Sequence, residues 1–319
     1  MAPSLRDLNT ADLETVYAEL TRSGLVQRLI QIAHEEDLGP PPPRGNGDIT
    51  SYATLGEGAE IGEAALVVRE GGVLAGLRVL PDLLRLFAPN VELRVRAADG
   101  HRAEAETVAA ALVGPFEEIL AAERTLLNIV GRLSGVATMT RRFVDAVAGT
   151  RAKIYDTRKT TPGLRVLEKY AVRCGGGMCH RIGLYDAVLI KDNHIGAAAP
   201  KDLAKWLSDV SARARARALE TGQGLKFVEC EVDSLAQLEQ ILGAGGCNVD
   251  VVLLDNMTAE ELRRAVEMRD RSGLRIELEA SGGVRLETVR GIAETGVDRI
   301  SAGALTHSVS SLDVALDIG

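Results

Sequence analysis

Residues 226–256 read KFVECEVDSLAQLEQILGAGGCNVDVVLLDN, and this stretch decides the fold. Its two ends, residues 226–232 and 249–254, are short apolar runs with β-prone side chains. Residues 234–242 between them carry apolar side chains at helical spacing. A strand, a helix and a second strand in this order predict parallel strands joined by a helical crossover.

The same alternation continues on both sides of this stretch. Further short apolar runs occur at 153–155, 187–190, 275–278 and 299–301. Helical segments are predicted over 202–219, 259–271 and 286–294. Alternating strands and helices predict an α/β protein with a parallel sheet of six strands, either open or closed into a barrel.

The first part of the chain has a different pattern of helices and strands, which predicts an α+β unit. Helices are predicted over 12–33 and 78–87, strands over 64–69, 72–75 and 91–96, and a long helix over 116–147. Residues 40–47 combine consecutive prolines with glycines, which predicts an exposed loop.

Composition excludes several classes of protein. The chain has 319 residues and a net charge of −8, from 37 Lys and Arg against 45 Asp and Glu, and 46% of its residues are hydrophobic, so disorder is excluded as the main state. The negative charge and an aromatic content of 3% argue against a nucleic-acid partner. No apolar run approaches the ~18 residues of a membrane span. The four cysteines fit no disulfide framework, and we expect a cytoplasmic protein.

Polar residues follow nearly every predicted strand of the second part. In parallel α/β folds the working residues gather at the carboxyl ends of the strands, so these positions are the candidates for a site. The candidate cations are Arg158, Lys159, Arg181 and Lys191, with His180 nearby in sequence. The candidate carboxylates are Glu231 and Asp255, and Glu229 shares the strand face of Glu231.

These residue types leave several chemistries open. The cations suit a phosphorylated or carboxylated substrate, and the carboxylates suit Mg²⁺. The glycines Gly282 and Gly303, which come after strands, allow backbone N–H groups to approach a phosphate. Lys191 within an apolar run also fits a Schiff-base lysine. Cys174, Cys179 and His180 suggest a metal site, but no second close pair of Cys or His follows.

Long blocks of sequence carry a family resemblance over nearly the whole chain. They lie at 47–51 (GDITS), 123–128 (ERTLLN), 133–138 (LSGVAT), 156–165, 168–172 (EKYAV), 175–181, 191–194 (KDNH), 229–231 (ECE), 254–256 (LDN), 279–283 (EASGG) and 301–306 (SAGALT). In this order they resemble quinolinate phosphoribosyltransferase. The resemblance implies an N-terminal α/β sandwich domain over 1–131 and an incomplete α/β barrel of about six strands over 132–319. It also implies a homodimer whose active sites are shared between chains.

The implied enzyme is a carboxylating nicotinate-nucleotide pyrophosphorylase. It joins quinolinate to phosphoribosyl pyrophosphate with Mg²⁺, and it releases nicotinate mononucleotide, pyrophosphate and CO₂ for NAD biosynthesis. The resemblance assigns catalysis to Lys159, Lys191, Glu231 and Asp255.

The resemblance also assigns the binding residues. Those for the quinolinate carboxylates are Arg158, His180, Arg181 and Lys191, with Arg124 from the partner subunit. Lys159 and Lys191 contact phosphoribosyl oxygens, and Glu231 and Asp255 bind ribose hydroxyls and Mg²⁺, directly or through water or substrate. Ser281, Gly282 and Gly303 bind the 5′-phosphate.

Two departures and two alternatives accompany this hypothesis. Cys179 stands where the family usually has Asn before the His-Arg pair, and the loop at 40–46 is longer than usual. One alternative is a related barrel enzyme that uses another heterocycle, such as the molybdate-transport-associated type. The other is a phosphate-binding barrel without catalysis, which the intact charged residues disfavour.

Overall fold

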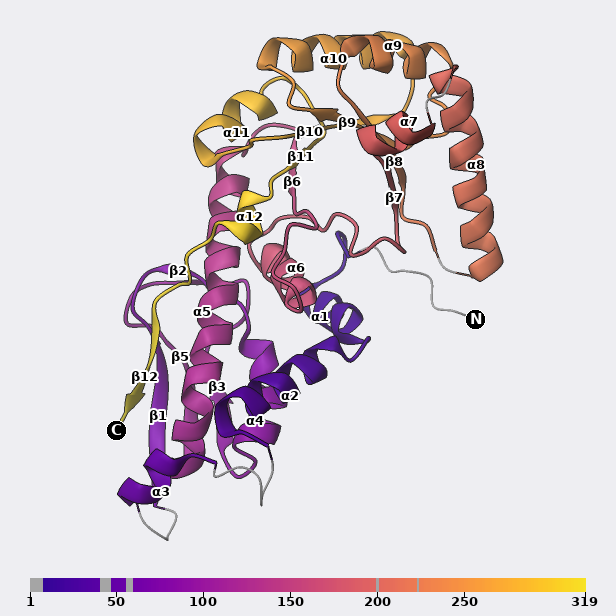
Figure 1. Cartoon of the computed structure of the whole chain (residues 1–319). Helices are drawn as coiled ribbons and strands as arrows, with labels where there is room; N and C mark the ends of the chain where they lie inside the picture. The colour runs from indigo at the N-terminus through magenta and orange to yellow at the C-terminus, as the bar shows by residue number, and fades with distance from the viewer. Residues whose placement is uncertain (1–7, 41–46, 56–59, 199–200, 223) are drawn as a thin grey trace. The chain divides into compact units, whose positions relative to one another are not determined.

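The computed structural model describes residues 8–40, 47–55, 60–198, 201–222 and 224–319. They form two compact units, whose helices and strands are labelled in Figure 1. The barrel unit comprises residues 8–10, 142–159 and 177–307, and the N-terminal unit comprises 11–141, 160–176 and 308–319. The domain boundary expected between residues 131 and 132 stays a prediction. Of the predicted loop at 40–47, residues 41–46 lie outside the described residues.

The N-terminal unit contains an antiparallel sheet of the order β12-β1-β5-β3. Its strands are β1 (Ile61–Val68), β3 (Glu92–Val95), β5 (Val108–Pro115) and β12 (Val314–Ile318). A second pairing joins β2 (Gly72–Val73) and β4 (Arg102–Ala103). Strands β4, β5 and β12 were not predicted, and β12 pairs with β1 across most of the sequence. The last strand of the chain therefore completes the first sheet.

The N-terminal unit also contains helices. They are α1 (Leu13–Thr21), α2 (Leu25–Leu38), α3 (Ile49–Leu55), η1 (Leu77–Val79), α4 (Leu80–Phe87), α5 (Phe116–Ala146) and α6 (Arg165–Cys174). The single helix predicted over 12–33 is wrong: the chain breaks at Gly24, whose φ of 73° is left-handed. Glycine adopts that conformation without steric cost, and an apolar periodicity that continues past it hides the break.

The barrel unit contains six parallel strands in the order β6-β11-β10-β9-β8-β7. The strands are β6 (Lys153–Tyr155), β7 (Val188–Ile190), β8 (Val228–Val232), β9 (Val251–Asp255), β10 (Glu277–Ser281) and β11 (Arg299–Ser301). The sheet ends at β6 on one side and at β7 on the other. The α/β class, the N-terminal unit with its sheet and the six-stranded parallel sheet are confirmed.

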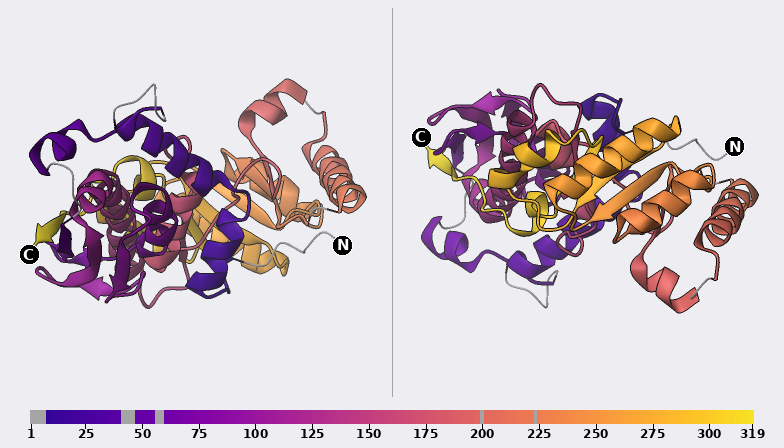
Figure 2. Two further views of the ribbon diagram at one scale, coloured as in Figure 1. Left: turned by 90° about the horizontal axis from the view of Figure 1, so that it is seen from below. Right: turned by 90° about the horizontal axis from the view of Figure 1, so that it is seen from above.

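Helices flank the outer side of this sheet, as the views in Figures 1 and 2 show. Those on the outer side are α8 (Leu203–Thr221), α9 (Leu235–Gly243), α10 (Ala259–Ser272) and α11 (Leu286–Ala293), whereas the short α7 (Asp192–Ala198) and α12 (Ala304–His307) follow the carboxyl ends of β7 and β11. The core of the sheet is apolar, with Val228, Val251, Val252 and Leu278 fully buried. Within the described ranges, no helix is both long and apolar enough to cross a membrane.

Asp298 ties the amino ends of three strands together. Its carboxylate accepts the Leu278 N–H at 2.9 Å, and its backbone carbonyl accepts the Lys153 N–H at 2.9 Å. The buried Arg269 of α10 donates to the same carboxylate at 2.7 Å. Removing the Asp298 carboxylate leaves the buried guanidinium with only the exposed Asp270 as its charge partner and leaves the Leu278 N–H without its acceptor, so this contact has a large effect on stability.

We therefore expect Asp298→Ala to lower the free energy of unfolding by about 3 kcal/mol. Asp270→Ala is the matched control, because Asp270 binds the same guanidinium at 2.6 Å but is 58% exposed, and it should cost less than about 1 kcal/mol. Urea unfolding at pH 7 measures both. Equal losses would show that the buried pair has no special role.

Candidate active site

The carboxyl edge of the parallel sheet brings the predicted polar residues together. Lys191 follows β7, Glu231 lies in β8, and Asp255 and Ser281 end β9 and β10. In the register of the sheet, Ser281 is paired with Asp255. Because all six strands point the same way, these side chains meet at one edge, which the sequence had predicted.

Lys191 and Glu231 form an ion pair between the ends of β7 and β8. The side chain of Lys191 is 44% exposed, whereas that of Glu231 is only 6% exposed. The carboxylate is thus fixed within the unit, while the ammonium group faces solvent. This arrangement holds a cation where a ligand can reach it.

Arg158 and Lys159 follow β6, and contacts from the end of the unit fix their backbone. Thr306 donates from Oγ1 to the Lys159 carbonyl at 2.6 Å. A Cβ at Gly303 would lie 3.0 Å from Cδ of Lys159 and 2.9 Å from the His307 ring. Gly303 therefore allows the close approach of these two side chains.

Gly282 has a conformation and a neighbour that both require glycine. Its φ is 94°, and a Cβ there would lie 2.2 Å from Oδ1 of Asn256. Asn256 itself donates from its backbone to the Ser281 carbonyl at 2.9 Å and from Nδ2 to Asp255 at 2.7 Å. The turns after β9 and β10 are thus locked together beside Asp255 and Ser281.

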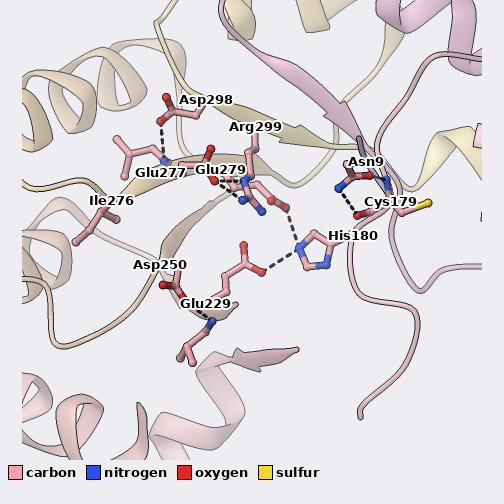
Figure 3. Close-up of polar contacts among 12 residues, drawn as sticks. Asn9, Cys179, His180, Glu229, Asp250, Ile276, Glu277, Glu279, Asp298 and Arg299 are labelled. Atoms are coloured by element: carbon pink, nitrogen blue, oxygen red, sulfur yellow. Dashed lines mark hydrogen bonds and ion pairs between the residues drawn. The ribbon is translucent and has the colours of Figure 1, made fainter. Parts of the chain in front are cut away.

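His180 lies against two buried carboxyl groups, as Figure 3 shows. Its Nε2 is 2.9 Å from Glu229 and 3.6 Å from Glu279. Its Nδ1 accepts the backbone N–H of Arg181 at 2.8 Å, so the ring proton belongs on Nε2. Glu229 and Glu279 have no exposed surface, and their oxygens lack a well-aligned hydrogen-bond donor. Both ring nitrogens of His180 therefore face atoms of the chain.

Burial raises the pKa of both glutamates. It raises the pKa of Glu229 to about 8 against the opposing effect of Arg299 and Arg181, and Glu231 adds to the rise. It raises the pKa of Glu279 to about 7, with a further rise from Glu229 and an opposing effect of His180. Arg299 stacks on the rings of Tyr155 and Phe227, which keeps its positive charge near both carboxyl groups. Each carboxyl group holds a proton more tightly than an exposed glutamate does.

Arg181 is a buried cation beside a second cation. It is 7% exposed, and burial together with the neighbouring Arg158 lowers the pKa of its guanidinium. Glu229 and Asp186 act in the opposite direction. Two guanidinium groups held against their repulsion favour a ligand with more than one negative charge.

Arg124 lies in the N-terminal unit, exposed on α5. It lines a pocket of about 280 Å³ together with Asn128, Ser311 and Asp313. The other predicted site residues, from Arg158 to Gly303, all belong to the barrel unit.

The structure adds residues that the sequence did not single out. They are Asp156, Asp186, Glu279 and Arg299, and the first three are fully buried. Among the described residues, the group of side chains able to hold a metal is His180, Glu229 and Glu279, and it includes neither Cys174 nor Cys179. All four cysteines are buried free thiols. A charged residue after or within a buried strand was the available signal for Asp156 and Glu279.

The fold and the charged carboxyl edge define an α/β enzyme for anionic substrates. The family model "Quinolinate phosphoribosyl transferase, N-terminal domain" matches residues 48–134, and the model of the C-terminal domain matches residues 136–317. The chain belongs to the quinolinate phosphoribosyltransferase family.

Individual relatives agree along most of the chain. The nicotinate-nucleotide pyrophosphorylase [carboxylating] of Mycobacterium leprae is 43% identical over 293 residues, which cover 91% of this chain and 95% of the relative. The solved nicotinate-nucleotide pyrophosphorylase of Francisella tularensis has a TM-score of 0.79 and 33% identity, over 98% of this chain and 99% of that one. That of Ehrlichia chaffeensis has a TM-score of 0.77 and 36% identity, over 92% and 98%.

The two buried glutamates make stability depend on pH. A folded-state pKa raised above the ordinary 4.5 means that folding keeps protons that the unfolded chain has lost. Their contribution is complete below about pH 4.5 and declines as the pH rises through about 7 to 8. We expect the urea midpoint to fall over this range and the fall to be smaller in Glu279→Gln, which is neutral throughout.

Glu267→Gln serves as the control, because Glu267 is exposed on α10. It should leave the pH dependence unchanged. A decline in Glu279→Gln as steep as in the wild type would contradict a raised pKa for Glu279.

Proposed function

We propose that this protein transfers the phosphoribosyl group of phosphoribosyl pyrophosphate to quinolinate and decarboxylates the product. Nicotinate mononucleotide, pyrophosphate and CO₂ are released, as a step of NAD biosynthesis. The observation that supports this most is the buried Arg181, whose guanidinium pKa is lowered by burial and by the neighbouring Arg158, because a dicarboxylate opposes both effects.

Quinolinate binds at the cationic residues of the carboxyl edge. Arg158, Arg181 and Lys191 take its two carboxylates, and a guanidinium offers each of them bidentate geometry. Family resemblance includes His180 in this set. Both ring nitrogens of His180 face atoms of the chain, so His180 acts on quinolinate binding indirectly. It accepts the backbone N–H of Arg181, which binds quinolinate.

Phosphoribosyl pyrophosphate binds along the same edge. Ser281, Gly282 and Gly303 lie at turns where backbone N–H groups meet the 5′-phosphate, and Lys159 and Lys191 contact phosphoribosyl oxygens. Glu231 and Asp255 face the ribose hydroxyls. Glu231 lies one residue before the end of β8 and Asp255 ends the neighbouring β9, and both offer hard carboxylate oxygens, so they fit Mg²⁺, directly or through water. When bound, Mg²⁺ neutralises charge on the pyrophosphate that leaves.

The residues also fit the order of bond changes. When the bond from the ribose carbon to pyrophosphate breaks, positive charge develops on the ribose, and a nearby carboxylate stabilises it. The quinolinate nitrogen then bonds to that carbon. The pyridinium nitrogen stabilises the electron pair that remains when CO₂ leaves the adjacent carbon, which then takes a proton. No covalent enzyme intermediate is required.

The active enzyme is a homodimer in which Arg124 completes the site of the other chain. Arg124 is exposed and lines a pocket with polar and apolar walls, so its charge is accessible to a neighbouring chain. The alternative is that Arg124 lies on the surface of α5 and contacts only its own chain.

An assay of purified protein tests the reaction. With Mg²⁺ and phosphoribosyl pyrophosphate, we expect nicotinate mononucleotide from quinolinate, and a kcat/KM for nicotinate lower by at least about a hundredfold, because nicotinate leaves a buried cation unpaired. Excess EDTA should abolish turnover. Comparable turnover of the two pyridines would contradict the assignment, and turnover of another heterocycle alone would favour the related barrel enzyme.

Mixing two inactive variants tests the shared site. Arg124→Ala and Lys191→Ala should each be inactive, but a mixed dimer carries both changes at one site and neither at the other. Unfolding and refolding them together in equal amounts should restore about one quarter of wild-type activity. If mixed dimers form and remain inactive, Arg124 acts within its own chain.

A further inference from the structure

The loop at residues 179–183 has no regular secondary structure, although it carries the His180-Arg181 pair. Parallel pairing with β6 ends just before it, where the Asp156 N–H donates to the Met178 carbonyl at 3.0 Å. From Cys179 onward, five consecutive backbone N–H groups donate to side chains. The loop is irregular but each of its five backbone N–H groups is hydrogen-bonded, so its conformation is set by the residues that accept these bonds.

Two buried aspartates accept three of the five bonds. Asp156 accepts the His180 N–H at 2.8 Å, and Asp186 accepts those of Ile182 at 2.8 Å and Gly183 at 2.9 Å. Lys226 lies 3.0 Å from Asp186, which balances its buried charge. Asp156 and Asp186 both have no exposed surface.

Asn9 makes the bonds that are most distant in sequence. Its Oδ1 accepts the Cys179 N–H at 2.7 Å, and its Nδ2 donates to the Cys179 carbonyl at 3.1 Å, as Figure 3 shows. Asn9 lies 170 residues before Cys179, in a turn that belongs to the barrel unit, and its neighbour Leu8 is buried. A single carboxamide thus satisfies both backbone groups of the residue that precedes His180.

We propose that Asn9 is a positioning residue for Arg181. The loop frame, meaning the side chains of Asn9, Asp156 and Asp186, fixes the backbone on both sides of Arg181, and Asn9 is the member supplied by the N-terminal segment. This inference rests on the proposed function, because Arg181 is a quinolinate-binding residue only in that reaction.

The repulsion between Arg181 and Arg158 explains why the loop frame is needed. Arg181 is buried beside Arg158, and the repulsion between the two cations favours a backbone shift that separates them. Two hydrogen bonds to Cys179 oppose such a shift at the residue where the regular pairing has ended. Loss of Asn9 should therefore weaken quinolinate binding while phosphoribosyl pyrophosphate, which relies on other strand ends, is held as before.

The test compares Asn9→Ala, Asn9→Gln and the wild type, with Gln27→Ala as a control that removes an exposed carboxamide from α2. For Asn9→Ala we expect the KM for quinolinate to rise about tenfold, while kcat and the KM for phosphoribosyl pyrophosphate change less than about twofold. Asn9→Gln should recover part of the affinity, and Gln27→Ala should behave as the wild type does.

Hydrogen exchange of the free protein provides a readout without activity. In Asn9→Ala the amides of residues 179–181 should exchange faster, with the strands of the barrel unit unchanged. Unchanged exchange there, or an unchanged quinolinate KM in an active variant, overturns the proposal. So does a joint rise of both KM values with a lower Tm, which indicates general destabilisation. An inactive wild type with faster exchange in the variant would instead refute the proposed function and keep the role of Asn9.

Discussion

The site depends on holding two cations together. Arg181 is buried with Arg158 nearby, and burial first and this second cation next lower the pKa of the Arg181 guanidinium. Repulsion of this kind is small in water and large inside a protein. The backbone that carries Arg181 must therefore be fixed before a ligand arrives. The bonds from residues 179–183 to buried or half-buried side chains meet that requirement.

The carboxylates of the site are arranged so that cations face outward. Glu231 is 6% exposed and anchors Lys191, whose side chain is 44% exposed. Glu229 lies two residues earlier on the same strand face and is fully buried behind the site. Burial raises the pKa of Glu229 to about 8, which favours its neutral form near pH 7, so the cations at the edge set the local field and attract polyanions. The chain can therefore be acidic overall and still bind quinolinate and phosphoribosyl pyrophosphate.

Local signals in the sequence predicted most of the barrel unit, because each short apolar run overlaps a strand, although β10 continues past the predicted end at 278 to Ser281. β6 and β11 lie where the sequence placed them, at 153–155 and 299–301. The prediction failed where distant residues decide the structure. β12 forms on β1 across nearly the whole chain, and Asn9 meets Cys179 across 170 residues. Parity showed that Glu229 shares a face with Glu231, but nothing local identified Glu279 as its neighbour.

The position of His180 explains why Glu229 and Glu279 are buried. Leucine at 229 and 279 would avoid the cost of burying carboxyl groups, and such replacements often stabilise a protein. Leucine, however, would remove the carboxyl oxygens that lie 2.9 and 3.6 Å from Nε2 of His180. With Nε2 facing carboxyl oxygens, the ring turns Nδ1 toward the Arg181 N–H, which it accepts at 2.8 Å. The other tautomer, with the proton on Nδ1, would present a donor to the N–H donor of Arg181. The carboxyl groups thus favour the tautomer with the proton on Nε2, which lets Nδ1 accept from the backbone of Arg181, in the way that outer partners fix histidines at metal sites.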